Sequence, residues 1–171
     1  AQYVRNIHQA LIEYDPDNKS VYDSRATLYL GQLHALETWA KREINKVPPS
    51  QRVLVTSHDA FNYFCDAYGF KSSSPVGWST GEVGAEETPE SRRQVIESIR
   101  TTGVPAIFVE TSVNGEAIRS IAKEAGVVVG GSLYSDSMGA PGSAGESYIG
   151  MMRENIITIT SSLRAAEKKS D

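Results

Sequence analysis

The chain has 171 residues, of which 40% are hydrophobic and 22% charged, and its net charge is −4. This composition is ordinary for a globular domain. The acidic balance and the lack of a Lys/Arg cluster argue against a phosphate-binding surface, so we expect no nucleic-acid partner. No apolar run approaches the roughly 20 residues that a membrane-spanning helix needs. The single cysteine, Cys65, cannot form an internal disulfide and leaves the redox compartment undecided.

Two helices are predicted at the start of the chain. Val4, Ile7 and Leu11 form one apolar stripe, which ends at the turn-forming segment 15–18 (DPDN). Over about 19–46, apolar residues recur with a period between 3.5 and 3.6, which predicts a helix of about 40 Å. Such a helix is typical of a connection between lobes. Because the chain begins within a helix, without an initiator methionine or signal segment, we expect it to be a fragment.

Short apolar strands alternate with helical patterns after Pro48 and Pro49, which indicates βαβ units and a parallel sheet. Strands are predicted at 52–56, 74–78 and 106–110, with a fourth beginning at 127–129. Helices are predicted at 59–68, from 88 to Gly103, at about 117–125 and after the loop 139–145, where Ser143 and Glu146 have capping-box spacing. The predicted fold class is therefore α/β: a Rossmann-like lobe with about four parallel strands flanked by helices, preceded by a long connecting helix.

Two residues that follow predicted strands could bind a metal together. His58 lies at a strand-to-helix turn, where the positive end of the helix dipole favours the neutral imidazole that a metal requires. Asp136 follows the fourth strand between Ser135 and Ser137, whose hydroxyls could orient its carboxylate. Ligands bind an open parallel sheet at the carboxyl ends of its strands, so residues distant in sequence can meet there. Taken singly, a packed turn histidine and an Asx-turn aspartate remain the alternatives.

The other polar candidates have weaker signals. Glu110 ends the third strand and could reach the same edge of the sheet, where we expect it to support a metal ligand rather than to bind the metal itself. Ser57 is expected to cap the helix next to His58. His8 and His34 lie outside any metal-ligand spacing and are interpreted as surface or packing residues. The chain contains neither a GxGxxG phosphate loop nor a GxSxG nucleophile elbow.

Three sequence motifs, in this order along the chain, are similar to those of a known family. They are TSHDAFNYF at 56–64 with AYGF at 67–70, VPAIFVE at 104–110, and YSDSMG at 134–139. Together they resemble the metal-binding solute-binding proteins of zinc and manganese ABC transporters, the TroA-like or ZnuA-like group (cluster A-I). The resemblance covers essentially the whole chain but only the second half of such a protein. It implies that 1–47 is the end of an amino-terminal lobe plus the interdomain helix, and that 48–171 is the carboxyl-terminal metal-binding lobe.

The resemblance also implies a function. In this family a metal lies between two lobes, held by two histidines from the first lobe and two ligands from the second, at positions that match His58 and Asp136. The expected cargo is Zn²⁺ or Mn²⁺, with Fe²⁺ as a further candidate, because imidazole and carboxylate ligands together do not select sharply. The expected partner is an ABC permease, and the expected location is periplasmic or extracytoplasmic and membrane-anchored. Any membrane association would come from an anchor or a permease outside this sequence.

Two other readings remain open. A metal-dependent hydrolase could use the same crevice with Glu110 as base, because a catalytic metal keeps an open coordination position. A surface adhesion module is the third reading, although no motif in the sequence supports it. A binding protein without enzymatic activity is the reading that the three motifs favour.

Overall fold

The computed structural model describes residues 1–56, 60–73, 88–104, 106–111 and 115–167. The chain divides into two compact units, 1–42 and 43–171. Within the described ranges, no helix combines the length and the apolar character needed to cross a membrane.

The first unit is a helical hairpin. Helix α1 (Gln2–Tyr14) and helix α2 (Lys19–Ile44) flank a short 3₁₀ turn (Pro16–Asn18), as the turn signal predicts. The Asp15 carboxylate accepts hydrogen bonds from Asn18 Nδ2 (2.9 Å) and the Tyr22 hydroxyl (2.7 Å) and so closes the turn. His8 of α1 hydrogen-bonds to Asp23 of α2 at 2.8 Å, which ties the two helices together. The predicted long helix is therefore confirmed to within two residues.

The second unit is built on parallel strands. Strand β1 (Val53–Val55) pairs with β2 (Lys71–Ser73), and β3 (Ala106–Glu110) pairs with β4 (Val128–Leu133). A parallel bridge between Thr56 and Phe108 joins the two pairs, which gives the strand order β2-β1-β3-β4. The chain leaves β1 toward one edge of the sheet and returns to β3 on the other side of β1. This is a topological switch point, where ligands of open α/β sheets bind.

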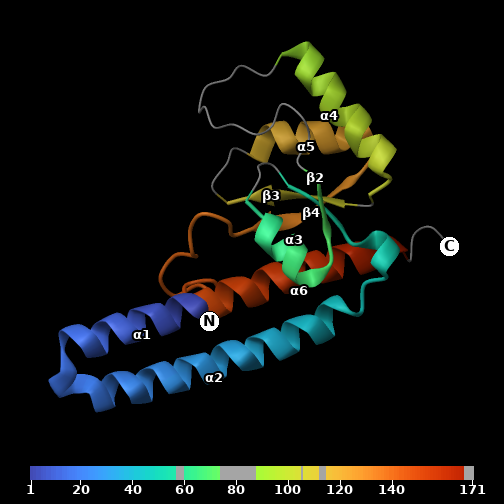
Figure 1. The fold of residues 1–171 in the computed structure, drawn as a ribbon. Coiled ribbons are helices and arrows are strands. Elements are labelled where there is room, and N and C mark those ends of the chain that lie inside the picture. The colour runs from blue at the N-terminus through green and yellow to red at the C-terminus, as the bar shows by residue number, and fades with distance from the viewer. Residues whose placement is uncertain (57–59, 74–87, 105, 112–114, 168–171) are drawn as a thin grey trace. The chain divides into compact units, whose positions relative to one another are not determined.

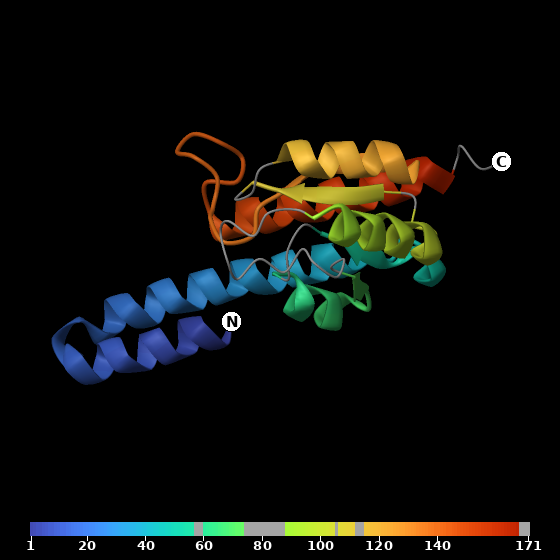
Figure 2. The same ribbon diagram turned by 90° about the horizontal axis from the view of Figure 1, so that it is seen from above.

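Helices cover both faces of this sheet. Helices α4 (Pro89–Thr102) and α5 (Gly115–Ala125) lie on one face, and α6 (Tyr148–Glu167) lies on the opposite face (Figures 1 and 2). Helix α3 (Asn62–Tyr68) connects β1 to β2 and ends at Gly69, whose φ of 70° suits a left-handed helix cap. The parallel arrangement with helices on both faces confirms the predicted α/β fold.

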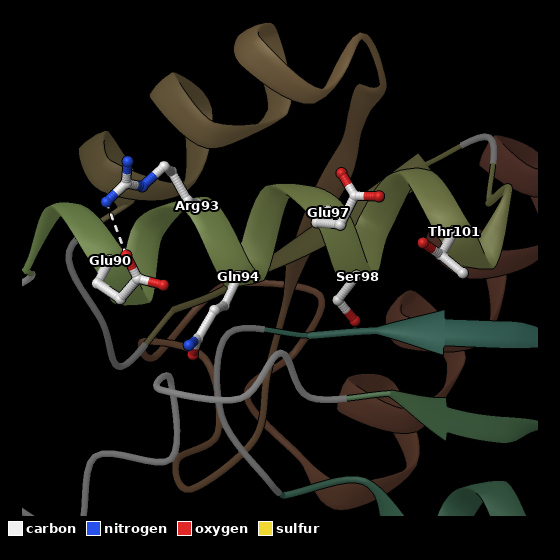
Figure 3. Close-up of a pocket in the computed structure, with 6 residues that line it drawn as sticks. All are labelled: Glu90, Arg93, Gln94, Glu97, Ser98 and Thr101. Atoms are coloured by element: carbon white, nitrogen blue, oxygen red, sulfur yellow. Dashed lines mark hydrogen bonds and ion pairs between the residues drawn. The ribbon is translucent and has the colours of Figure 1, made fainter.

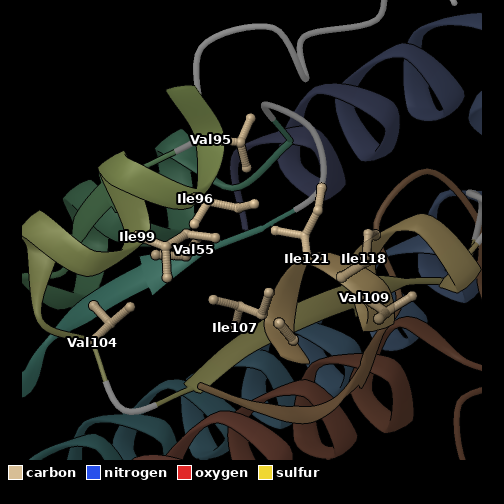
Figure 4. Packing of buried hydrophobic residues seen from close by; sticks show 10 residues of the cluster. Val55, Val95, Ile96, Ile99, Val104, Ile107, Val109, Ile118 and Ile121 are labelled. Atoms are coloured by element: carbon tan, nitrogen blue, oxygen red, sulfur yellow. The ribbon is translucent and has the colours of Figure 1, made fainter. Parts of the chain in front are cut away.

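One hydrophobic core cluster of this unit lies between the sheet and the α4–α5 layer (Figure 4). Helix α4 contributes the stripe Val95, Ile96 and Ile99, which appears in the sequence as helical periodicity. Strand β3 is buried at all five positions, as expected for a central parallel strand covered on both faces. The remaining members of the core are Val55, Val104, Ile107, Val109, Ile118, Ile121 and Ala122.

Three local predictions differ from the structure. The second strand lies at Lys71–Ser73, whereas the predicted segment 74–78 falls outside the described residues. Helix α3 begins at Asn62, later than the predicted start at Asp59, which lies outside the described part. Its N-cap is Phe61, so the expectation that Ser57 caps this helix is wrong. The capping box is wrong: α6 begins at Tyr148, and the Ser147 hydroxyl accepts the Gly150 N–H at 3.1 Å. The serine immediately before the helix caps it instead, because Ser143 lies one turn too early.

Candidate metal centre

The carboxyl edge of the sheet is set by three strand ends. Thr56, directly after β1, is buried and bridges to Phe108 of β3. Glu110 at the end of β3 pairs in register with Leu133 at the end of β4, and the Thr111 N–H donates to the Leu133 carbonyl at 2.9 Å. The strand ends therefore lie side by side, as the sequence argument requires. Ser57 and His58, which come next in the sequence, lie outside the described residues.

Asp136 lies in the turn that follows β4. It is exposed, as is Ser137, while Ser135 is half-buried. Asp136 lies three positions after Leu133, which lies in the ladder with Glu110. A short, exposed carboxylate just beyond the strand end at Leu133 is suited to bind a cation from solvent.

Glu110 occupies a different environment. Its side chain is fully buried at the end of β3, with 0% of its surface exposed. At this position the carboxylate is not presented to an ion or a substrate arriving from solvent. Glu110 ends β3, as predicted, and pairs with Leu133 at the end of β4, and its role beside a metal site stays a prediction.

The segment 134–147 is a compact loop that carries Asp136. The Gly139 N–H donates to the Gly145 carbonyl at 2.8 Å, so the loop closes on itself beyond Asp136. The Glu146 carboxylate accepts the Gly142 N–H at 2.6 Å, in a turn for which Gly142 has a φ of 82°. These hydrogen bonds satisfy backbone groups of the loop, which lies beyond the strand pairing of β4. They give the loop a defined shape.

Asn155 is a site-adjacent residue that the sequence analysis missed. This asparagine of α6 is buried at 2% exposure and hydrogen-bonds to both backbone groups of Tyr134, two residues before Asp136. A signal was present in the sequence: Asn155 lies between Met152 and Ile159 on the buried stripe of the last helix, where a polar residue needs a specific partner.

Other candidate groups do not form a second centre. Within the described part of the chain, no group of three or more His, Cys, Asp or Glu side chains could hold a metal ion. His34 is exposed on α2, and Cys65 is buried in α3, in agreement with the interpretation of His34 as a surface residue and of Cys65 as a small buried hydrophobe.

A surface pocket lies along α4, lined by Glu90, Arg93, Gln94, Glu97, Ser98 and Thr101 (Figure 3). All six residues come from this one helix, and the Arg93 guanidinium is bound to the Glu90 carboxylate at 2.7 Å. With its cation and carboxylate paired to each other, this surface has the character of an ordinary solvated helix face.

Comparisons with known proteins place the chain in a wider group. A family model described as "ZnuA: Zinc-uptake complex component A periplasmic" matches residues 1–162. The chain is 36% identical over 162 residues to the manganese-binding lipoprotein MntA of Halalkalibacterium halodurans, which covers 95% of the chain and 53% of that protein. It is 34% identical over 161 residues to the manganese ABC transporter substrate-binding lipoprotein PsaA of Streptococcus pneumoniae, covering 94% of the chain and 51% of that protein. The chain thus spans about half the length of the curated relatives it matches.

Solved structures agree with the sequence relatives. The periplasmic zinc-binding protein TroA of Treponema pallidum superposes with a TM-score of 0.81 at 34% identity, covering 93% of this chain and 58% of that one. A Mn-bound mutant of a periplasmic metal-binding protein from Candidatus Liberibacter asiaticus superposes with a TM-score of 0.82 at 28% identity, covering 94% and 58%. These findings confirm the predicted resemblance, and the relatives are themselves named as periplasmic proteins or as lipoproteins that bind metal or serve as substrate-binding components of ABC transporters.

Proposed function

This chain belongs to the ZnuA family of periplasmic zinc-uptake components, and from that premise we propose that it is the carboxyl-terminal portion of a two-lobed receptor for a divalent transition metal. The receptor captures the ion outside the cytoplasm and passes it to the permease of an ABC importer. The observation that carries the proposal is the match of the family model to residues 1–162. The relatives named for manganese or zinc binding support Mn²⁺ or Zn²⁺ as the cargo, with Fe²⁺ as a minor candidate.

Asp136 and His58 are the proposed ligands from this portion of the protein. The Asp136 carboxylate is exposed on a closed loop at the carboxyl edge of the sheet, beside the strand that ends in Glu110. His58 follows β1, which is bridged to β3 at Thr56. An imidazole and a carboxylate leave the remaining coordination positions to ligands from the other lobe, and the closure of the lobes completes the shell.

Ser57, Ser135, Ser137 and Glu110 are proposed to surround the site rather than to bind the ion. Partners of this kind orient ligands, and changing them commonly lowers metal affinity by about 10–100-fold. The burial of Glu110 favours this role over that of a general base. The hydrolase and adhesion readings have no observation in their favour, so the receptor is the single proposed function.

Calorimetry on the complete two-lobed protein and on this chain alone tests the proposal. The complete protein should bind Mn²⁺ or Zn²⁺ far more tightly, because two ligands alone leave water in the other positions. In the complete protein, Asp136→Ala and His58→Ala should each lower affinity by more than the roughly 10–100-fold expected for an outer-shell change. Asp66→Ala and His34→Ala, which alter exposed residues of the same types in α3 and α2, serve as matched controls.

Equal affinity of the chain alone and the complete protein would contradict the two-lobed mechanism. Full affinity in both ligand variants would contradict the ligand assignment. The native cargo is identified by elemental analysis of the complete protein purified without added metal, and Mn²⁺ or Zn²⁺ is the expected content.

A further inference from the structure

Asn155 makes a two-way contact with the strand that leads to the proposed ligand. The Tyr134 N–H donates to Asn155 Oδ1 at 2.9 Å, and Asn155 Nδ2 donates to the Tyr134 carbonyl at 2.7 Å. The two residues are 21 positions apart in sequence, and the asparagine side chain is 2% exposed. One amide therefore satisfies both backbone groups of a residue that has just left the sheet.

This contact lies immediately before the Asp136 turn. The Leu133 carbonyl accepts the Thr111 N–H from the β3 side at 2.9 Å, and the next residue, Tyr134, is held by Asn155 from the α6 side. Two consecutive residues are thus fixed from two neighbouring elements. Asp136 follows after only one intervening residue, so the position of its Cα depends directly on this anchor.

The ring of Tyr134 lies against the return of the loop. Gly145, at the return of the loop, lies so close that a Cβ there would be 2.6 Å from Tyr134 Cε2. Gly145 also accepts the Gly139 N–H at 2.8 Å through its carbonyl. The loop that carries Asp136 therefore closes against the same tyrosine that Asn155 holds.

Helix α6 holds β4 at a second point farther from the site. The register between β3 and β4 shifts after Ile107, so that Phe108 pairs with Gly131 and Gly130 is left out of the pairing. The Ser162 hydroxyl donates to the Gly130 carbonyl at 2.5 Å. Asn155 and Ser162 are seven residues apart, which places them on one face of α6. Asn155 hydrogen-bonds to the residue that follows the carboxyl end of β4, and Ser162 hydrogen-bonds to β4 at its irregularity.

We propose that Asn155 is a positioning residue for metal capture, which acts by anchoring Tyr134 so that the Asp136 carboxylate is held in place for the ion. This inference rests on the proposed function of Asp136. Metal coordination tolerates only a few tenths of an ångström in ligand position. Without such an anchor, the exposed turn would be conformationally free before the metal binds. Ordering its residues on binding would then cost entropy and lower the metal affinity.

A purely structural role would give different results from a positioning role. A buried amide that only satisfied Tyr134 would, when removed, lower the stability of the fold and leave the metal site of the folded protein unchanged. A positioning role predicts a change in affinity and in coordination geometry while the protein is fully folded. The two roles are separated by measurements on folded, metal-saturated protein.

The test uses the complete two-lobed protein with the variant Asn155→Leu, which keeps the approximate shape of the side chain and removes both hydrogen bonds. We expect a loss of Mn²⁺ affinity of about tenfold or more, measured by calorimetry. With Co²⁺ at saturating concentration as a spectroscopic probe, the visible absorption spectrum should also shift. The matched control is Thr160→Val: Thr160 is a buried polar residue of the same helix, and its hydroxyl donates to Ile156 within α6 at 2.8 Å.

Two further variants make the result decisive. Asn155→Asp keeps an acceptor for the Tyr134 N–H and loses the amide donor, so it should show a smaller affinity loss and a shifted Co²⁺ spectrum. It carries the test if Asn155→Leu does not fold. Asp136→Ala, measured alongside, tests the proposed function independently.

The inference is overturned if the folded Asn155 variants bind Mn²⁺ and absorb with Co²⁺ as the Thr160→Val control does. If Asp136→Ala loses affinity in that case, the proposed function stands and only the role of Asn155 fails. If Asp136→Ala retains full affinity, the ligand assignment fails, and the positioning role fails with it.

Discussion

The helical hairpin of residues 1–42 and the α/β unit of residues 43–171 are stabilised in different ways. Helix α1 has no buried residue, and Ile7 on it is 60% exposed. Directional contacts within the hairpin are hydrogen bonds between polar side chains, such as those of His8 with Asp23 and of Tyr22 with Asp15. In the second unit, Ile107 and its neighbours are fully buried between the sheet and two helices. The same type of side chain therefore contributes very differently in the two regions.

The largest expected effect comes from truncating the same residue in each region. Ile107→Ala should lower the free energy of unfolding by about 2–5 kcal/mol, because it leaves a cavity in a packed core. Ile7→Ala should change it by about 0.5 kcal/mol or less, because most of that side chain is already in water. Urea unfolding of the chain followed by circular dichroism measures both. Similar losses of unfolding free energy for the two variants would show that isoleucine side chains contribute equally to stability in the hairpin and in the α/β unit.

A smaller, opposite pair of effects is expected at two glycines. Gly131→Ala in β4 should destabilise the protein by about 1–3 kcal/mol, because the new Cβ would lie 2.5 Å from Thr158 Cγ2 at a φ of 144°. Gly31→Ala in α2 should stabilise it by up to about 1 kcal/mol, because nothing lies within 4 Å and alanine favours a helix.

Thermal unfolding of the two glycine variants compares the regions directly. A destabilising Gly31→Ala would mean that α2 is more tightly surrounded than its open glycine indicates. A neutral Gly131→Ala would mean that α6 can move away from β4, which would also weaken the argument that α6 anchors the strand.

The smallest expected effect is the pH response of the hairpin. The hydrogen bond from Asn18 and then that from Tyr22 lower the pKa of Asp15 below 3.8, and the bonds from Lys19 and then His8 lower that of Asp23. Because both carboxyl groups have a lower pKa when folded, their contribution is present above the unfolded value and is lost as the pH falls through the folded value. The hairpin should therefore lose stability below about pH 4.

Carbon-13 NMR titration of the side-chain carboxyl groups measures these pKa values in the chain. Asn18→Ala should raise the pKa of Asp15 toward its ordinary value of 3.8 and leave that of Asp23 unchanged, since Asn18 bonds only the former. An unchanged pKa of Asp15 in this variant would show that the hydrogen bond from Asn18 does not lower that pKa.

The elements with strong periodicity were predictable. The second helix follows from a repeat over more than six turns, and strand β3 follows from a run of apolar residues that are all buried. Strand β2 at Lys71–Ser73 was not predicted, because it is short and polar and pairs with β1 through its backbone, which leaves no apolar signal. The cap of α6 was misassigned because two serines, Ser143 and Ser147, offer the same local signal one turn apart.

The sequence by itself determined the α/β class and the family, and it is the source of the two proposed ligands, because apolar periodicity and ordered motifs are local properties of the chain. Only the tertiary structure decided that Glu110 is buried beside Leu133 and that Asn155 holds Tyr134 across 21 positions. Such contacts depend on strand register and on the face that α6 presents to β4. These are set by packing between distant segments, which no local pattern encodes.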